Sequence, residues 1–522
     1  MPVTDYTFLL SHEEFSNNYA NMIVATFKRF YRPVGLVRDE AASIEDAKQI
    51  VNVEREIVSQ ISSNQYDTTK KSSLGALNDD YGQLMNWTRY ILNLASGRGI
   101  SVNITLNETI FVKQPRRLKQ TIDYFLKLPK RTQVNYIMWR WIDTFENVIV
   151  KPEDKMNAII TFGASEDVDP AYRDEGCTRF VTQTFPMVVD RLLFAEYVPQ
   201  DTVQKVDSML RQMKFEFNAL LSHHNYDWLT ENAKKIIKEK IDSITASVDY
   251  YFEVMDNKFL DEYYYFIWMP SIHTFMNQLS TVKIGSFTTN FRSIRGFRGM
   301  KLATAFSEQQ PQVFSPYLAT EFQTILLSFS SLAYPWFLNE APMAVNYAGA
   351  THTLAQELLK SIDTKGMRFY KNGTEGLSMG DAFTNGFRSL VRCMIRQYYT
   401  YSDYGFREDY EPNSDLADVV FAVNLALKLT YKAYINYTNT AITKRYNIGY
   451  SGFTNDQLFF VRYAQLMCTK EPYEEDFQLF ENRQIPSEFR VNAPLQNSKD
   501  FAYVFNCPCG SPMNPNDKCV VF

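Results

Sequence analysis

The chain has 522 residues, of which 45% are hydrophobic and 22% are charged, and its formal net charge is -5. This length and apolar content predict a folded protein with a large buried core, and they exclude a disordered tail or a small disulfide scaffold. Because 59 acidic residues outnumber 54 basic ones, the overall charge does not favour nucleic acid as a partner.

The first half of the chain, from about residue 10 to 280, has the hydrophobic pattern of amphipathic helices. In the segment 228–244, isoleucines at 236, 237, 241 and 244 form one apolar stripe, and Thr230 is the expected N-cap. The stretch 291–301 breaks this pattern with two glycines and a basic residue at every third position. This stretch is a candidate for a solvated hinge near the domain boundary, and the predicted domains are 1–283 and 284–522. A nucleic-acid patch is the alternative for this stretch, and the negative net charge disfavours it.

After this boundary the sequence predicts an extended segment, a helix around 353–363, a second helix around 416–434 and a loop-rich C-terminus. The longest apolar run, 325–338, contains three serines and Pro335 and is too short to span a membrane. The first 14 residues as written have neither the basic start nor the apolar stretch of a signal peptide.

Five histidines limit the metal chemistry that the chain can perform. No two of them are spaced three to five residues apart, so a single helix cannot present the pair of imidazoles that mononuclear zinc hydrolases commonly use. The five are His12, His223, His224, His273 and His352.

Several distinctive strings follow one another along the C-terminal third. They are Asn346-Tyr-Ala-Gly349, Leu427-Lys-Leu-Thr-Tyr-Lys-Ala-Tyr434, Asp456-Gln-Leu-Phe-Phe-Val-Arg-Tyr-Ala-Gln-Leu-Met-Cys468, Pro486-Ser-Glu-Phe-Arg-Val491, Leu495-Gln-Asn-Ser-Lys-Asp-Phe501 and Met513-Asn-Pro-Asn-Asp-Lys-Cys-Val-Val-Phe522. In this order they resemble the neprilysin family of zinc metallopeptidases. Upstream, Trp139-Arg-Trp141 and the helix after Trp228 also resemble the helical lobe of that family, so the resemblance covers nearly the whole chain.

The resemblance implies a fold that is mainly α with a small β component. It implies a two-lobed ectodomain that encloses a peptide chamber, with a helical lobe at 1–283 and a thermolysin-like lobe at 284–522. In the family, a His-Glu-x-x-His helix and a glutamate on a second helix hold zinc, and the Glu of the first motif removes a proton from the zinc-bound water.

At these motif positions the chain departs from the family. Gln356 and Lys360 stand where the two histidine ligands belong, and Val419 stands at the third ligand. Only the general-base position, Glu357, is retained, and Val423 replaces the acid that would orient a ligand histidine. A lone glutamate cannot assemble a zinc site of useful affinity, so the resemblance predicts no metal ligand set and no cofactor.

The substrate-binding positions of the family are partly kept. Arg490, which in the family binds a substrate carbonyl, is present, and the pair that holds the substrate main chain aligns with Thr304 and Ala305. Gln484 stands at the histidine that stabilises the transition state, and Asn482 stands at its acidic partner.

The substitutions themselves suggest how the former metal site is rebuilt. Lys360 follows Glu357 by three residues, so an ion pair on one helix face is expected, with a lysine exposed to solvent as the alternative. Val419 and Val423 lie four residues apart and are expected to fill the vacated space with apolar volume. His352 lies off the face that would be needed to replace a ligand.

The six cysteines include no C-x-x-C pair. By resemblance, Cys393 and Cys519 form the disulfide that fastens the C-terminus. The family partners of Cys177, Cys468 and Cys507 lie before the equivalent of Met1. Either the chain lacks an N-terminal segment, with the anchor or signal that this segment would carry, or these cysteines form other disulfides, for instance Cys468 with the additional Cys509. Buried free thiols of a cytosolic protein are a further alternative.

Five glycosylation sequons permit secretion without proving it, since a chain this rich in asparagine would contain about as many by chance. They start at Asn86, Asn103, Asn107, Asn372 and Asn436. By resemblance we expect an extracellular or cell-surface location, with membrane attachment only through an N-terminal segment that is absent here.

The leading hypothesis is a non-catalytic, neprilysin-like protein that binds a peptide or a protein ligand. The alternatives are an active zinc metalloendopeptidase that cleaves small peptides, in which case zinc is the cofactor, and a structural ectodomain that forms homodimers.

Overall fold

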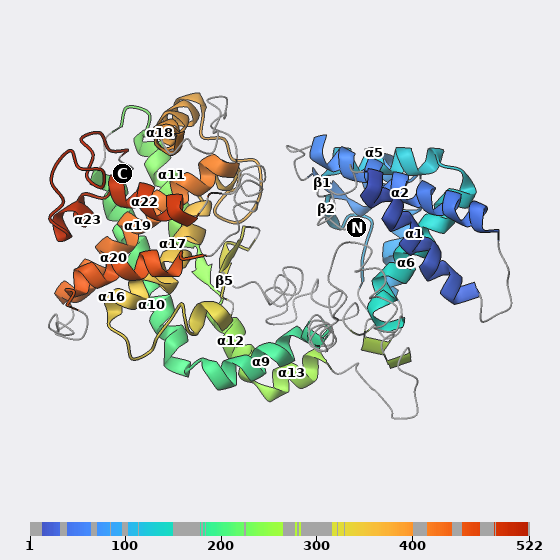
Figure 1. Cartoon of the computed structure of the whole chain (residues 1–522), viewed down its shortest axis with the longest axis horizontal. Helices are drawn as coiled ribbons and strands as arrows, with labels where there is room; N and C mark the ends of the chain where they lie inside the picture. The colour runs from blue at the N-terminus through green and yellow to red at the C-terminus, as the bar shows by residue number, and fades with distance from the viewer. Residues whose placement is uncertain are drawn as a thin grey trace. The chain divides into compact units, whose positions relative to one another are not determined.

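The computed structural model describes residues 13–31, 39–63, 70–83, 85–96, 103–112, 114–149, 178, 181–182, 184–223, 226–264, 277–278, 281–282, 285, 316–320, 322–327, 329–399, 415–440, 452–469, 485 and 487–519. The chain forms two compact units, Met1–Val181 and Thr182–Phe522 (Figure 1). The domain boundary predicted at 283/284 and the basic stretch 291–301 lie outside the described ranges, so that boundary stays a prediction.

The first unit is helical and carries a small two-stranded sheet. Strands β1 (Lys70–Ser73) and β2 (Thr109–Val112) pair in antiparallel register, with Lys70 opposite Val112. The helices of this unit are α1 (Glu13–Tyr31), α2 (Glu40–Ser63), α3 (Leu74–Tyr81), α4 (Trp87–Ser96), α5 (Pro115–Lys127) and α6 (Lys130–Ile149).

The core of the first unit is centred on Trp139, which is fully buried. The rings of Tyr19 and Phe27 each lie 6.0 Å from the Trp139 ring in edge-on geometry. The indole N–H of Trp139 donates to the Tyr19 hydroxyl at 3.1 Å, and that hydroxyl donates to Glu54 at 3.0 Å. Arg140 pairs with the same carboxylate at 3.3 Å. These partners offset the cost of burying the Glu54 charge, although burial still raises the pKa of Glu54.

The second unit contains a three-stranded sheet and most of the helices that the structure describes. Strands β3 (Thr245–Ala246), β5 (Thr324–Leu326) and β4 (Tyr317–Ala319) lie in that spatial order, with β3 parallel and β4 antiparallel to β5. The helices are α9 (Pro186–Tyr197), α10 (Gln200–His223), α11 (Glu231–Ser243), α12 (Val248–Met255), α13 (Asn257–Tyr263), η4 (Phe329–Leu332), α16 (Met343–Ala348), α17 (Ala350–Lys360), η5 (Gly366–Arg368), α18 (Asp381–Tyr399), α19 (Asp415–Thr440), α20 (Asn455–Leu466), α22 (Ser487–Asn497) and α23 (Lys499–Val504).

Helix α11 shows how the local sequence specifies its own element. The Thr230 hydroxyl accepts the N–H of Ala233 at 3.2 Å, so the predicted N-cap is confirmed. Ile237 and Ile241 are buried on the predicted apolar stripe. Lys240 is also buried, which the hydrophobic pattern did not predict.

The two helices expected to carry the motif positions are present with shifted ends. The helix predicted around 353–363 is α17, which starts three residues earlier and ends three residues earlier. It starts early because Gly349 turns the chain directly into α17; a Cβ at Gly349 would lie 2.4 Å from the carbonyl oxygen of Trp336, so a side chain has no room there. The helix predicted around 416–434 is α19, which continues to Thr440.

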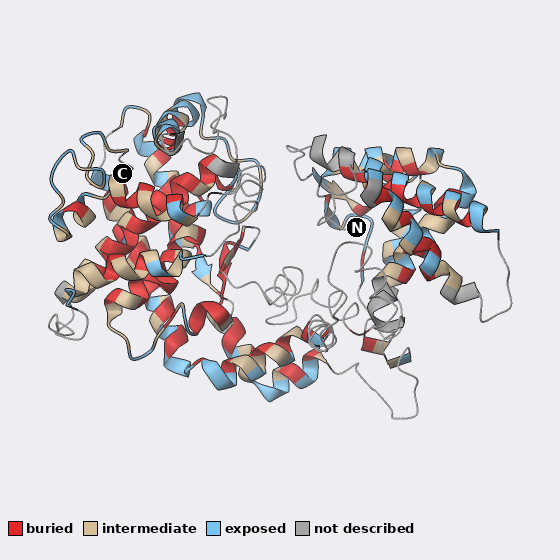
Figure 2. Cartoon of the chain, viewed as in Figure 1, coloured by how far each residue is buried: buried red, intermediate tan, exposed pale blue. Residues whose placement is uncertain are grey.

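Burial in the second unit is concentrated where α17 and α19 pack together, with α10 and α16 beside them. Figure 2 shows buried residues along these helices. The prediction of a mainly helical fold with a small β component is confirmed. None of the helices in the described ranges has the length and apolar content needed to cross a membrane.

Candidate functional site

Helix α17 carries three of the predicted site positions on adjacent turns. Gln356 is partly buried, Glu357 is buried and Lys360 lies at the exposed C-terminal end of the helix. The helix packs along α19, which carries Val419 and Val423. The fold therefore places both motif helices against each other, as the resemblance implies.

Both carboxylate oxygens of Glu357 are occupied by protein donors. The Lys360 ammonium donates to Oε1 at 2.6 Å, and the backbone N–H of Leu318 in β4 donates to Oε2 at 2.9 Å. The predicted ion pair is thus present, although the Lys360 side chain is 46% exposed while that of Glu357 is 9% exposed. Hydrogen bonds to a charged, buried acceptor are among the stronger ones in proteins. They hold the carboxylate between α17 and the sheet.

The side chains at the other motif positions are poor ligands for zinc. Zinc in proteins is held by thiolate, imidazole or carboxylate groups, whereas Gln356 offers an amide, Lys360 an ammonium and Val419 an alkyl group. Val423 is 1% exposed, and Val419 packs at the edge of the main core. Among the described residues there is no group of three His, Cys, Asp or Glu side chains that could hold a metal ion.

The turn that follows α17 contains a buried carboxylate that the sequence reasoning missed. Asp363 accepts the backbone N–H groups of Lys365 at 2.9 Å and Gly366 at 2.7 Å. Asp418 of α19 accepts both the backbone N–H and the hydroxyl of Thr364, at 3.0 and 2.6 Å. Burial raises the pKa of Asp363, and the charge of Asp418 raises it further. These bonds tie the end of α17 to α19.

A buried lysine from a distant helix supports the same turn. The Lys240 ammonium donates to the carbonyl oxygen of Gly366 at 2.8 Å and also to that of Phe369. Burial lowers the pKa of Lys240 to about 8, and the charge of Asp363 acts against that shift. A lysine within a helical pattern gives no sign of such a role, because the two carbonyl groups lie more than 120 residues away in the chain.

Arg490 lies on α22 and is held in a defined position. Its Nε–H donates to the carbonyl oxygen of Ile485 at 3.0 Å, and its own carbonyl oxygen accepts the Tyr463 hydroxyl at 2.5 Å. No hydrogen bond or ion pair joins its two terminal nitrogens to any residue that the structure describes.

His352 of α17 contacts Tyr463, the residue whose hydroxyl donates to the carbonyl oxygen of Arg490. Its ring meets that of Tyr463 edge-on, with centroids 4.8 Å apart. Neither ring nitrogen of His352 has a hydrogen-bond partner, and burial lowers its pKa to about 3. The residue is a neutral imidazole within the core, as expected of a histidine that does not replace a lost ligand.

Four of the predicted site positions, Thr304, Ala305, Asn482 and Gln484, lie outside the described residues, and they stay predictions. Cys177 lies outside as well.

The disulfide predicted between Cys393 and Cys519 is confirmed. It joins α18 to the C-terminal segment. Cys468, Cys507 and Cys509 are free in the structure, so the alternative pairing of Cys468 with Cys509 is not formed. Cys468 and Cys509 are also exposed, which disagrees with the alternative of buried free thiols for these two residues.

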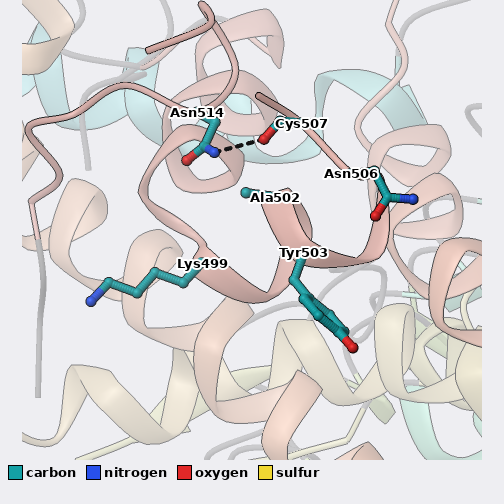
Figure 3. Close-up of a pocket in the computed structure, with 6 residues that line it drawn as sticks. All are labelled: Lys499, Ala502, Tyr503, Asn506, Cys507 and Asn514. Atoms are coloured by element: carbon teal, nitrogen blue, oxygen red, sulfur yellow. Dashed lines mark hydrogen bonds between the residues drawn. The ribbon is translucent and has the colours of Figure 1, made fainter. Parts of the chain in front are cut away.

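One surface pocket lies away from the motif helices, on α23 and the loop after it (Figure 3). The Asn514 side-chain amide donates to the carbonyl oxygen of Cys507 at 2.8 Å across it. None of its lining residues is a predicted ligand position. They are Lys499, Ala502, Tyr503, Asn506, Cys507 and Asn514.

Comparison with solved structures agrees with this architecture. The zinc metalloprotease ZMP1 of Mycobacterium tuberculosis, solved with an inhibitor, aligns with a TM-score of 0.68 over 100% of this chain and 76% of its own, at 16% identity. PepO from Lactobacillus rhamnosis aligns with a TM-score of 0.69 over 98% of this chain and 76% of its own, at 14% identity. At these identities the likeness shows the fold alone, and the predicted fold class is confirmed.

Three curated relatives are similar in sequence. Human membrane metallo-endopeptidase-like 1 is 25% identical over 100% of this chain and 67% of its own length. Endothelin-converting enzyme 1 of Mus musculus is 26% identical over 81% of this chain and 54% of its own, and neprilysin-1 of Caenorhabditis elegans is 23% identical over 98% and 68%. The chain thus spans between 54% and 68% of the length of these three relatives.

The family described as peptidase family M13 matches the chain in two parts, its N-terminal region at residues 1–251 and its peptidase region at 316–521. These matches, the motif strings and the fold together show that the chain belongs to peptidase family M13, the neprilysin-like zinc metallopeptidases.

Proposed function

We propose that this chain is a non-catalytic member of family M13 that binds peptides or a partner protein. The observation that carries the proposal is the state of Glu357. A general base needs a free oxygen within reach of the water whose proton it takes. Here Oε1 is held by Lys360 and Oε2 by the N–H of Leu318, so the carboxylate is part of the protein framework.

The donor set around this carboxylate supports the same proposal. The family implies zinc, but Gln356, Lys360 and Val419 do not fit it, and the ammonium of Lys360 would repel a cation from the position that it occupies. We therefore assign no cofactor. The positive charge of Lys360 instead satisfies the buried carboxylate.

Arg490 supports ligand binding. Its Nε is fixed to Ile485, so the guanidinium is oriented before a ligand arrives, which reduces the entropy lost on binding. A guanidinium with free terminal nitrogens suits a peptide carbonyl or carboxylate. In this proposal Thr304 and Ala305 contact the ligand main chain, and homodimerisation is not required for binding.

We place the protein outside the cell or at its surface, as a glycoprotein. The Cys393–Cys519 disulfide supports this, because disulfides persist mainly in oxidising compartments.

Peptide cleavage and peptide binding test the proposal together. Purified protein is incubated with a mixed peptide library, with and without a zinc chelator, and its metal content is measured by elemental analysis. We expect no chelator-sensitive cleavage and far less than one zinc per chain. Turnover that a chelator abolishes would establish the active-peptidase alternative.

Calorimetric titration with the same peptides separates ligand binding from a purely structural role. We expect Arg490→Ala to weaken binding by about tenfold or more, the cost of one charge-assisted hydrogen bond. Arg490→Lys retains the charge but not the fork geometry and is expected to recover part of the loss. Arg211→Ala, on the exposed face of α10, is the matched control and should bind as the wild type does. Absence of binding to the wild type would favour the structural ectodomain.

A further inference from the structure

The five sequons differ in structure: Asn436 is half-buried, whereas the other four asparagines, Asn372 among them, are exposed. Asn372-Gly373-Thr374 lies at the tip of a hairpin after η5, whereas Asn436-Tyr437-Thr438 lies within the last turns of α19. A sequon can carry a glycan in the folded protein only if the asparagine side chain faces solvent with room for a bulky sugar. This requirement separates the two.

The Asn372 hairpin is a short, self-contained turn. The N–H of Tyr370 donates to the carbonyl oxygen of Thr374 at 2.8 Å, and the N–H of Gly373 donates back to Tyr370 at 2.9 Å. Gly373 has φ 78°, a left-handed conformation that glycine adopts without strain. The turn thus forms from its own residues and presents Asn372 at an exposed position.

The side chain of Asn372 is oriented by its own sequon. Its Oδ1 accepts the backbone N–H of Thr374 at 3.2 Å and the Thr374 hydroxyl at 2.7 Å. This is an Asx turn, which asparagine forms readily in loops. Because Oδ1 takes both bonds, the Nδ2 amide is left without a hydrogen bond to any described residue and is accessible from solvent.

Asn436 lies in the opposite environment. It is half-buried on α19 and is not without an interaction partner. The hydroxyl of Thr438 donates to the carbonyl oxygen of Ile435 at 2.8 Å and so turns away from Asn436. A helical backbone also does not form the Asx turn, and a half-buried side chain leaves less room for a bulky sugar than an exposed one.

We infer that Asn372 is an N-glycosylation site and that Asn436 is not. The inference rests on the proposed extracellular location, since the modification requires passage through the secretory pathway. The co-substrate is an oligosaccharide linked to a lipid pyrophosphate. The Asn372 Nδ2 forms a C–N bond to the anomeric carbon, the C–O bond to the pyrophosphate breaks, and the amide loses one proton as the lipid pyrophosphate leaves.

The test expresses the full chain in the secretory pathway of cultured animal cells. Molecules with an intact Cys393–Cys519 bond are isolated, so that all material analysed has passed through the oxidising compartment. A glycosidase that converts glycosylated asparagine to aspartate is applied, and peptides are mapped by mass spectrometry. We expect conversion at Asn372 and none at Asn436.

Variants make the assignment specific. In gel electrophoresis, Asn372→Gln and Thr374→Ala should each increase the mobility of the protein by the equivalent of one glycan. Thr374→Ser should retain the glycan, and Asn436→Gln should leave the mobility unchanged. An unmodified Asn372 in disulfide-bonded protein, or a modified Asn436, would overturn the inference. Peptide binding is measured separately, so failure of the glycan assignment and failure of the proposed function are distinguishable.

Discussion

The Lys360 ammonium lies 2.6 Å from Oε1 of Glu357, three residues earlier on α17. By the resemblance in sequence, Lys360 is expected at the position of a zinc-binding imidazole of the family and Glu357 at that of the general base. Under the proposed function, the ammonium of Lys360 supplies the positive charge beside the carboxylate in place of a metal. The pair is half-exposed on the lysine side, so its Coulomb energy is reduced by solvent.

Removing the lysine charge should destabilise the protein modestly. We expect Lys360→Met to lower the free energy of unfolding by about 1 kcal/mol, because Glu357 then keeps only the Leu318 N–H while its desolvation cost is unchanged. Urea unfolding measures the effect. Lys235→Met, on the exposed face of α11, is the control, and an equal effect of both variants would show that the pair contributes nothing.

Restoring ligands should restore metal binding. We expect the triple variant Gln356→His, Lys360→His, Val419→Glu to bind about one zinc per chain in elemental analysis, since α17 and α19 pack against each other as a two-helix site requires. The wild type should bind far less. A zinc-free triple variant would show that packing has moved these positions apart, and stoichiometric zinc in the wild type would refute the non-catalytic proposal.

Acid should destabilise the fold through His352. Its pKa falls from 6.5 to about 3 on folding, so between these values the unfolded chain binds a proton that the folded chain does not. The free energy of unfolding must then decrease as pH falls below 6.5, by up to about 1.4 kcal/mol per pH unit.

Unfolding of the wild type and of His352→Met at pH 7 and pH 5 checks this expectation. The wild type should lose roughly 2 kcal/mol more than the variant over this interval. The variant should also be no less stable at pH 7, because it removes two buried polar atoms that lack partners. His223→Gln, in the last turn of α10, is the control. Equal acid sensitivity of the wild type and His352→Met would contradict the expectation.

Substitution of Lys240 should lower the free energy of unfolding more than substitution of the exposed lysines of α11. Lys240→Met leaves the carbonyl groups of Gly366 and Phe369 without their charged donor, and we expect a loss of about 2–3 kcal/mol in the free energy of unfolding. Lys238→Met on the exposed side of the same helix should change it by less than about 0.5 kcal/mol. Thermal and urea unfolding compare the two, and similar losses would disprove the role of Lys240.

The disulfide should contribute strongly to stability. Cys393 and Cys519 are 126 residues apart, and closing a loop of that length stabilises the folded state by about 4–5 kcal/mol through the unfolded chain. Cys393→Ser should therefore lower the unfolding midpoint markedly, while Cys468→Ser, at an exposed free thiol, should not. An unfolding midpoint that Cys393→Ser leaves unchanged would mean that the disulfide is not formed.

Local patterns in the sequence predicted the helices well and their ends less well. The N-cap at Thr230 and the stripe of Ile237 and Ile241 follow from side chains within one turn of each other, and the structure confirms them. The start of α17 did not follow from such a pattern, because it depends on the contact of Gly349 with Trp336, which local periodicity does not contain.

The sequence by itself determined the chemistry available at the motif positions. Gln356 and Lys360 are not zinc ligands of the family type in any conformation, and the helical repeat places Lys360 within reach of Glu357. Both conclusions depend only on side-chain type and on spacing within one helix.

Only the tertiary structure decided what holds the site in place. The N–H of Leu318 reaches Glu357 across 39 residues, and the Lys240 ammonium reaches Gly366 across 126. The burial that lowers the pKa of His352 likewise comes from packing around α17 and is not specified by its neighbours in sequence. Such contacts arise when the whole core closes, since a buried polar group takes whichever partner packing brings within reach, and no local pattern encodes that partner.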